Sequence, residues 1–502
     1  MIQINEIFRF IRTYTNIAIP FIIAVLYLPA IYTANAATPA LTGGKTGAPV
    51  VYPKELDGMA LGYMALDVET GVVLSEYMPN QNLIPASTLK VITTGVGILT
   101  LGAEFRFKTE VLACGEIKDG VLNGSLIIKG GGDPAFASDL FEAEKESVIF
   151  EAITAMLSQH GISSITGNII ADNSFFSDSP VHQAWNWEDI GNGYGAGTHG
   201  LNFAENKFNF RVIKTTDGKI NAELPEWASV IPLNVKLNIK PSGSEPSYIC
   251  VFATPESRDY VFSGHIQSGK SDITAEAANT RPALLCAYSL HKYLISNGIG
   301  ISGIYMAENT SASISAFAEN NKHLGTIYSP YFVSVAEKMN ILSHNTMADA
   351  IFKMSGLHCR GEGSFSNGAA ATDSVLRKLM PDITNFRIVD GSGLARVNAV
   401  SPALFCFFLK AMYGTYVYPS FYKSLCPPES PQYSSMIKGI STRNSMRIKS
   451  GGMSGVRCYT GYVKTLKGKI IAFSWMANGF NAPGRKAMEV ADEWLKSVIT
   501  NN

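Results

Sequence analysis

The segment around residues 85–101 constrains the fold of this chain more than any other stretch. Pro85 and Ser87 are typical of a helix start, and the apolar pattern of the following run, Val91–Leu101, indicates a buried helix. Residues three apart lie on one face of a helix, so Lys90 would bring its amine beside the Ser87 hydroxyl. The sequence therefore predicts a nucleophile with a base next to it at the mouth of a buried helix.

A serine hydroxyl is a weak nucleophile at neutral pH and needs a positioned base. Lys90 can be that base only if burial or a second cation lowers its pKa. Backbone amides at the helix start would favour negative charge developing near Ser87. On its own, Ser87-x-x-Lys90 is better explained by a helix-capping serine and a solvated lysine. The assignment therefore depends on the rest of the chain.

A second candidate element is Ser343-His344-Asn345, which lies between two predicted helices, Phe332–Ile341 and Thr346–Met354. A hydroxyl and an amide two residues apart at such a junction can face one cavity, which suits proton relay and the binding of a substrate amide. Considered alone, the serine and asparagine would simply cap the next helix.

A third element is the strand-like segment Arg447–Gly452, with two following strands predicted at Cys458–Lys464 and Lys469–Ala477. A substrate peptide could pair with this segment as an added strand. The alternative is a tight glycine turn without a role in binding.

This third element would complete the site around Lys90. A second buried lysine, Lys449, would help to keep Lys90 neutral, and Ser450 would bind a carboxylate. Gly451 and Gly452 would let a substrate backbone lie close to the strand.

The length, net charge and cysteine spacing of the chain limit the kinds of function that it can have. At 502 residues the chain is long enough for two or three domains. Acidic and basic residues number 41 each, which argues against nucleic acid as a partner. The seven cysteines lack Cys-x-x-Cys spacing, so neither a zinc site nor a redox pair is predicted, and no disulfide pairing can be assigned.

The first 36 residues have the features of an export signal. Arg9 and Arg12 precede an apolar stretch, Ile17–Tyr32, and Ala34-Asn35-Ala36 offers a cleavage site between small residues. We expect a signal peptide at residues 1–36 and no transmembrane segment after its removal. A retained membrane anchor is the alternative, although the apolar stretch is short and contains prolines.

Together, the three elements resemble the signature of the penicillin-binding proteins and serine β-lactamases, in the same order and context. The long stretch between Ser87 and Ser343 points to a large insertion. This layout is similar to the class C low-molecular-mass penicillin-binding proteins, the D-alanyl-D-alanine carboxypeptidase/endopeptidase family. Further stretches that match this family are Gly132-Asp133-Pro134, Gly195-Ala196-Gly197, Asn202-Phe203 and Asp390–Asn398.

The resemblance implies an α/β (α+β) fold. We expect a penicillin-binding transpeptidase/β-lactamase-like domain, an antiparallel sheet flanked by helices, with a two-module β-rich insertion between the first and second motifs. The short alternating segments between residues 207 and 271 are typical of a small all-β module. The expected catalytic domain covers residues 37–104 and 316–502, an inserted α/β domain covers 105–205 and 274–315, and a nested all-β domain covers 206–273.

Two residues depart from the family pattern. His344 occupies the middle of the second motif, where many relatives carry an acid, and Ser450 stands where threonine is usual. Ser450 keeps the hydroxyl, so its chemistry is preserved. His344 would either make the site pH-sensitive or point away from it, and we favour the second interpretation.

The family implies a serine hydrolase that acts on the D-Ala-D-Ala end, or on the cross-link, of peptidoglycan stem peptides in the periplasm. Penicillin should acylate Ser87, and no metal or other cofactor is expected. By this resemblance, the catalytic residues are Ser87, Lys90, Ser343, Asn345 and Lys449, and the substrate-binding residues are Ser450, Gly451 and Gly452. The backbone amides of Ser87 and Gly452 would form an oxyanion hole.

Two other functions remain open from the sequence. A β-lactamase would need an efficient deacylating base and would turn over penicillin rapidly. A non-catalytic muropeptide or penicillin sensor would keep the pocket without the chemistry.

Overall fold

The computed structural model describes residues 54–309, 321–430, 433 and 436–502. The signal peptide expected at residues 1–36 lies outside these residues. Within the described part, none of the helices combines the length and the apolar character needed to cross a bilayer.

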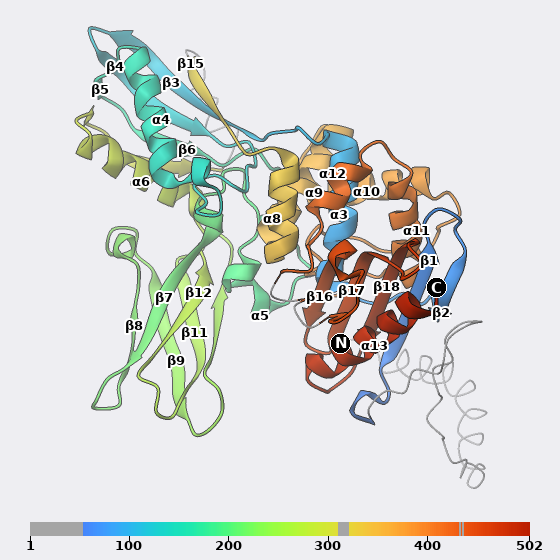
Figure 1. Cartoon of the computed structure of the whole chain (residues 1–502). Helices are drawn as coiled ribbons and strands as arrows, with labels where there is room; N and C mark the ends of the chain where they lie inside the picture. Colours follow the sequence, from blue (N-terminus) through green and yellow to red (C-terminus); the bar gives the residue numbers. More distant parts are fainter. Residues whose placement is uncertain (1–53, 310–320, 431–432, 434–435) are drawn as a thin grey trace, which may run out of the picture. The chain divides into compact units, whose positions relative to one another are not determined.

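A five-stranded antiparallel sheet joins the two ends of the described chain (Figure 1). Its strand order is β16-β17-β18-β1-β2, so the segment that carries Lys449 lies at an edge of the sheet. The strands are β1 (Ala60–Asp67), β2 (Val73–Tyr77), β16 (Arg447–Met453), β17 (Val456–Lys464) and β18 (Ile470–Asn478).

Helices cover both faces of this sheet, because successive side chains of each strand point to opposite sides. On β1, Met64 and Leu66 belong to one hydrophobic cluster, whereas Tyr63 and Ala65 belong to a second cluster with α13 (Gly484–Asn501). The first cluster includes residues of α3 (Lys90–Leu101), α8 (Phe332–Leu342), α9 (Asn345–Arg360), α10 (Phe365–Leu379), α11 (Pro402–Tyr413) and α12 (Tyr418–Ser424). The expected sheet flanked by helices is confirmed.

The insertion begins with a second sheet, of seven strands. Two helices, α4 (Glu146–Gln159) and α6 (Pro282–Ser296), share a hydrophobic cluster with its strands. The strands are β3 (Lys108–Lys118), β4 (Val121–Lys129), β5 (Ser164–Ile165), β6 (Ile169–Asp172), β13 (Gly300–Ile301), β14 (Tyr305–Glu308) and β15 (Asn321–Tyr328).

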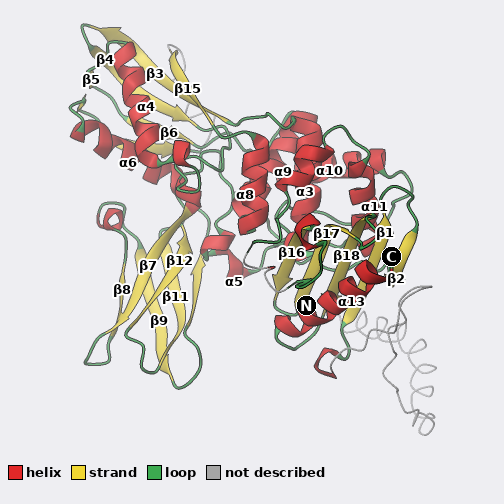
Figure 2. Cartoon of the chain, in the orientation of Figure 1, coloured by secondary structure: helices red, strands yellow, loops and turns green. Residues whose placement is uncertain are grey.

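A smaller module is nested in the insertion and consists almost entirely of strands and loops (Figure 2). Two three-stranded sheets, ordered β12-β7-β8 and β10-β11-β9, enclose an aromatic core in which Phe210 and Phe262 stack at 4.0 Å between ring centroids. The strands are β7 (Lys207–Lys214), β8 (Ile220–Glu223), β9 (Asn234–Ser242), β10 (Tyr248–Ala253), β11 (Asp259–Gln267) and β12 (Asp272–Ala278).

The pairing of β15 bears on the domain boundaries. This strand pairs antiparallel with β3, in the sheet of the insertion. We therefore propose that the chain returns to the catalytic domain after Tyr328, later than the boundary at residue 316 expected from the sequence. The remaining boundaries stay as proposals.

Candidate active site

The predicted nucleophile lies in a 3₁₀ turn, Ala86–Leu89, and α3 starts only at Lys90. The sequence had predicted one continuous helix from Ser87. In a 3₁₀ turn, side chains three apart are eclipsed rather than merely on the same face. The turn therefore stacks the two side chains, and Lys90 Nζ lies 3.0 Å from Ser87 Oγ.

The Lys90 amine is surrounded by groups that suit its neutral form. It is fully buried, and Nζ lies 2.7 Å from both Asn345 Oδ1 and the Ser392 carbonyl oxygen. A neutral amine has two N–H groups and one lone pair. The two acceptors can take both N–H groups, which leaves the lone pair facing the Ser87 hydroxyl.

Electrostatics favour the same protonation state. Burial and, to a smaller extent, the nearby charge of Lys449 lower the pKa of Lys90 to about 7, against the opposing effects of Asp349 and Asp390. A lysine with this pKa is partly unprotonated near neutral pH and can act as a base, whereas an ordinary lysine is protonated there and cannot.

Asn345 is oriented by the insertion. Its Nδ2 donates to the backbone carbonyl of Tyr194 at 2.8 Å, so its Oδ1 is the atom that faces Lys90. The amide thus bridges the first motif and a loop of the insertion.

The second and third motifs meet at Lys449. This lysine is fully buried, and its Nζ lies 3.1 Å from Ser343 Oγ and 2.9 Å from the Ser450 carbonyl oxygen. Burial lowers the pKa of Lys449 to about 8, so the side chain is mostly charged at neutral pH. Ser343 ends α8 in a left-handed conformation, with φ of 57°, that turns its hydroxyl toward this lysine.

Strand β16 lies directly against the nucleophile turn. A β-carbon on Gly451 would be 2.5 Å from the Pro85 carbonyl oxygen and 2.9 Å from the Ser87 backbone nitrogen, so only glycine fits. Next to it, Ser450 Oγ accepts a hydrogen bond from the Tyr433 hydroxyl at 3.0 Å. Gly451 therefore brings the edge strand into contact with the turn that carries Ser87.

A loop at residues 390–398 supports Lys90 from the other side. Asp390 accepts hydrogen bonds from the backbone amides of Gly393 and Ala395 and from the side chains of Asn398 and Trp185, at 2.8–2.9 Å. Asp349, on α9, accepts from the backbone amides of Gly391 and Ser392. These bonds hold the Ser392 carbonyl against Lys90.

The motifs open into a cavity of about 660 Å³. Ser87, Ser343, Asn345 and Gly452 line it, while Lys90 and Lys449 lie buried behind it. The rest of the lining includes charged and aromatic side chains. Those from the insertion are Glu188, Asp189, Tyr194 and Tyr248, and Arg396 comes from the loop at residues 390–398. The cavity therefore offers a nucleophile at its base and groups of both charge signs around it.

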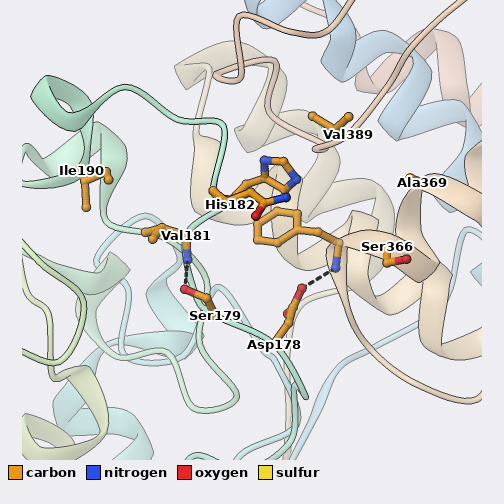
Figure 3. Close-up of a pocket in the computed structure, with 10 residues that line it drawn as sticks. Asp178, Ser179, Val181, His182, Ile190, Ser366, Ala369 and Val389 are labelled. Carbon is orange, nitrogen blue, oxygen red and sulfur yellow. Dashed lines mark hydrogen bonds between the residues drawn. The ribbon is translucent and has the colours of Figure 1, made fainter. Parts of the chain in front are cut away.

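A second cavity, of about 480 Å³, lies between the loop around residues 178–190 and α10 (Figure 3). His182, Val181 and Ile190 line it from the loop, with Ser366 and Ala369 from α10. Its lining includes none of the predicted site residues, so it is not the catalytic cavity.

The structure thus brings all three motifs together. The hydrogen bonds among the described residues link Ser343 to Lys449, and Lys90 to Ser87 and Asn345. The sequence analysis assigned no role to several supporting residues: Asp390 was noted only as part of a stretch that matches the family, and the single acids and tyrosines elsewhere carry no local signal. These residues are Asp349, Asp390, Tyr433, Tyr194 and Glu205.

His344 points away from the cavity lining and toward the insertion. Its Nε2 lies 3.1 Å from Glu205 Oε2, and its Nδ1 accepts from the Met347 backbone amide at 3.4 Å, which caps α9. Of the two interpretations of His344 given above, its geometry fits the one in which the ring faces away.

Comparison with known proteins supports the same family. The family model of the D-Ala-D-Ala carboxypeptidase 3 (S13) family matches residues 49–498. The chain is 24% identical over 457 residues to a D-alanyl-D-alanine carboxypeptidase of Actinomadura sp., covering 87% of this chain and 81% of that protein. It is also 24% identical to D-alanyl-D-alanine carboxypeptidase DacB of Haemophilus influenzae, over 85% of this chain and 86% of the relative.

A solved structure has the same fold. Penicillin binding protein 4 (dacB) from Haemophilus influenzae superposes with a TM-score of 0.76 at 21% identity, over 89% of this chain and 98% of that one. A second structure of that protein, complexed with a novel β-lactam, gives a TM-score of 0.72 at 20% identity. With the family model covering most of its length, this chain belongs to the D-Ala-D-Ala carboxypeptidase 3 (S13) family.

Proposed function

We propose that this protein is a serine D-Ala-D-Ala carboxypeptidase that hydrolyses peptidoglycan stem peptides through an acyl-enzyme, and that penicillin inhibits it by acylating the same serine. The observation that carries the proposal is the Lys90 amine, whose pKa is lowered to about 7, at 3.0 Å from the Ser87 hydroxyl. Membership of the family supports the choice of substrate.

In the proposed acylation step, neutral Lys90 takes the proton of Ser87 as Oγ attacks the carbonyl carbon of the penultimate D-alanine. The negative charge of the tetrahedral intermediate would be held by the backbone amides of Ser87 and Gly452. Collapse breaks the C–N bond, and the proton held by Lys90 passes to the leaving amine. D-Alanine departs, and the stem peptide stays bound to Ser87 as an ester.

Lys449 and Ser450 are proposed to receive the terminal carboxylate of the substrate. Lys449 would contribute its positive charge, which the lowered pKa of about 8 leaves mostly in place at neutral pH. Ser343 would relay a proton between the two lysines, and its contact with Lys449 at 3.1 Å supports one half of that path. Asn345 would both orient Lys90 and bind the stem amide.

In the proposed deacylation step, water attacks the ester with Lys90 again as the base, which regenerates the Ser87 hydroxyl. The substrate lies in the cell wall, so we propose that the protein works outside the cytoplasmic membrane. A D,D-endopeptidase activity on cross-linked stems would use the same steps, with the second stem in place of D-alanine.

Substitution of Ser87 tests the proposal directly. We expect Ser87→Ala and Lys90→Ala to abolish both covalent labelling by a fluorescent penicillin and release of D-alanine from a pentapeptide. Ser366→Ala, in the second cavity, is the matched control and should keep both activities. Labelling that persists in Ser87→Ala would overturn the assignment. Rapid turnover of penicillin by the wild type would instead favour a β-lactamase.

A further inference from the structure

A left-handed turn in the insertion carries Glu205 at its centre. Ala204, Glu205 and Asn206 have φ angles of 50°, 58° and 55°, a region that residues with a β-carbon adopt only at an energetic cost. The side chain of Asn206 holds the turn: Oδ1 accepts from the Phe203 backbone amide at 3.0 Å, and Nδ2 donates to the Gly197 carbonyl at 3.2 Å. Backbone strain that buried hydrogen bonds maintain points to a function for the turn, which is to fix the direction of the Glu205 side chain.

The turn directs the Glu205 carboxylate at His344. Oε2 lies 3.1 Å from His344 Nε2 and 3.3 Å from Lys207 Nζ, and Oε1 accepts a hydrogen bond from the Ser138 hydroxyl. The side chains of Glu205 and His344 are each only 11% exposed. Burial opposes ionisation, but the hydrogen bond from His344 and the charge and hydrogen bond of Lys207 outweigh it and lower the pKa of Glu205 below its usual value. The carboxylate is therefore ionised at neutral pH.

His344 is held from two sides. Its Nδ1 accepts a hydrogen bond from the Met347 backbone amide, and a ring nitrogen that accepts carries no proton. The ring proton of a neutral His344 is therefore on Nε2, where it is donated to Glu205. The helix cap and the carboxylate together fix both the orientation and the tautomer of the ring.

His344 stands between two residues of the proposed active site. Ser343, which precedes it, contacts Lys449, and Asn345, which follows it, contacts Lys90. The insertion also holds Asn345 through the Tyr194 carbonyl. Because planar peptide units couple consecutive residues, a displacement of His344 would move both neighbours.

We infer that Glu205 is a positioning residue for acylation: through His344, it sets where the Ser343 hydroxyl and the Asn345 amide lie around the two lysines. This inference rests on the proposed function. Glu205 contacts none of the reacting groups, so its effect is transmitted by geometry alone. Misplacement of catalytic groups by about 1 Å costs on the order of 100-fold in rate. Loss of the Glu205 charge should therefore slow acylation by about 10- to 100-fold.

The experiment compares Glu205→Gln with Glu276→Gln in the full chain. Glu276 pairs with the same lysine, Lys207, at 3.0 Å but has no bond to His344, so it is the matched control. Rates of Ser87 acylation by a fluorescent penicillin are measured for both variants, with thermal unfolding of each as the check on folding. The ¹⁵N NMR signals of the His344 ring, identified by their loss in His344→Asn, report on the ring itself.

We expect Glu205→Gln to slow acylation and to shift the His344 ring signals, while Glu276→Gln does neither. Asparagine is a good helix cap but has no imidazole to bond Glu205, so His344→Asn should slow acylation with α9 intact. In that background, Glu205→Gln should have less than a 2-fold further effect. Equal rates for the two glutamine variants, or the same fold-change from Glu205→Gln with and without His344, would overturn the inference.

Failure of the proposed function has a different outcome. If the wild type is not acylated by penicillin and releases no D-alanine, the proposed function fails and the comparison of variants has no baseline. If the wild type is active and Glu205→Gln is as active as Glu276→Gln, only the positioning role fails. Should Glu205→Gln not fold, the acylation rate of His344→Asn decides the inference: a wild-type rate in that variant contradicts it.

Discussion

A β-carbon placed on Gly451 would lie 2.9 Å from the backbone nitrogen of Ser87. The edge strand of the sheet and the nucleophile turn are therefore in direct main-chain contact, which only a residue without a side chain permits. This contact ties the third motif to the first.

Gly451→Ala should push the two main chains apart. The new methyl group would meet backbone atoms of Pro85, Ser87 and Thr88 at 2.5–2.9 Å, and backbone cannot rotate away as a side chain would. We expect a loss of about 1–3 kcal/mol in the free energy of unfolding, typical of overpacking, and at least a ~100-fold slower acylation by penicillin. Urea unfolding and labelling rates check both. Gly243→Ala, where the added carbon meets nothing within 4 Å, should match the wild type in both assays.

The two lysines predict a bell-shaped pH profile. Lys90 must be neutral to act as a base, so acylation should rise as the pH increases through its pKa of about 7. Lys449 must be charged to bind a carboxylate, so binding should weaken as the pH rises above its pKa of about 8. We expect kcat/KM for D-alanine release to reach its maximum between these values.

A substrate with an amidated C-terminus provides the control for this profile. It has no carboxylate to pair with Lys449, so the alkaline decline should flatten while the acidic limb remains. A profile that falls as the pH rises from 6 to 7 would be inconsistent with Lys90 as the base.

Asp390→Asn should disturb the support beneath Lys90. Both carboxylate oxygens of Asp390 accept from N–H donors, and an amide would place its own NH₂ group against two of them. We expect the free energy of unfolding to fall by about 2–3 kcal/mol, the usual effect of losing buried hydrogen bonds to a charged group. Acylation should slow as well, because the Ser392 carbonyl would shift away from Lys90. The exposed acid Asp373 is the control, and Asp373→Asn should unfold at nearly the same urea concentration as the wild type.

Lys353→Met should weaken the attachment of the loop that borders the second cavity (Figure 3). The Lys353 side chain is buried, its Nζ lies 2.7 Å from Asp178 Oδ1, and it sits 4.3 Å from the centre of the Phe365 ring. Its loss leaves a carboxylate that is only partly exposed without its cation. We expect a destabilisation of about 1–2 kcal/mol, less than for a fully buried pair because solvent reaches Asp178. The double variant with Asp178→Asn should recover part of this loss in thermal unfolding. No recovery would mean that the ion pair is not the cause.

The sequence predicted the parts of the site that have a local signature. Ser87 and Lys90 are three apart, so their contact follows from helical geometry, and the apolar run of α3 indicates that this helix is buried. The order of the motifs, through the resemblance to a known family, indicated that Lys449 and Ser343 would lie nearby. The predicted strands and helices around these motifs correspond to observed elements, although α9 continues to Arg360, past its predicted end at Met354.

The contacts that tune the site could not be predicted in this way. The Ser392 carbonyl and the Tyr194 carbonyl are main-chain atoms, whose placement depends on tertiary structure rather than residue type. The left-handed conformation of Glu205 is unexpected for a glutamate, so no propensity would indicate that it reaches His344. The pairing of β15 with β3, on which the proposed late return of the chain from the insertion rests, is a long-range contact that periodicity does not encode.

Helix α9 carries Asn345, Asp349 and Lys353 four residues apart, and therefore along one face. Asn345 contacts Lys90, the proposed base. Asp349 binds the loop that supports Lys90, and Lys353 pairs with Asp178 of the insertion. Removing the inserted modules to obtain a minimal enzyme would leave the buried Lys353 without the Asp178 carboxylate. It would also remove the Tyr194 carbonyl that orients Asn345. The catalytic domain therefore depends on the insertion for two contacts, and a truncated version would need substitutions that replace both of them.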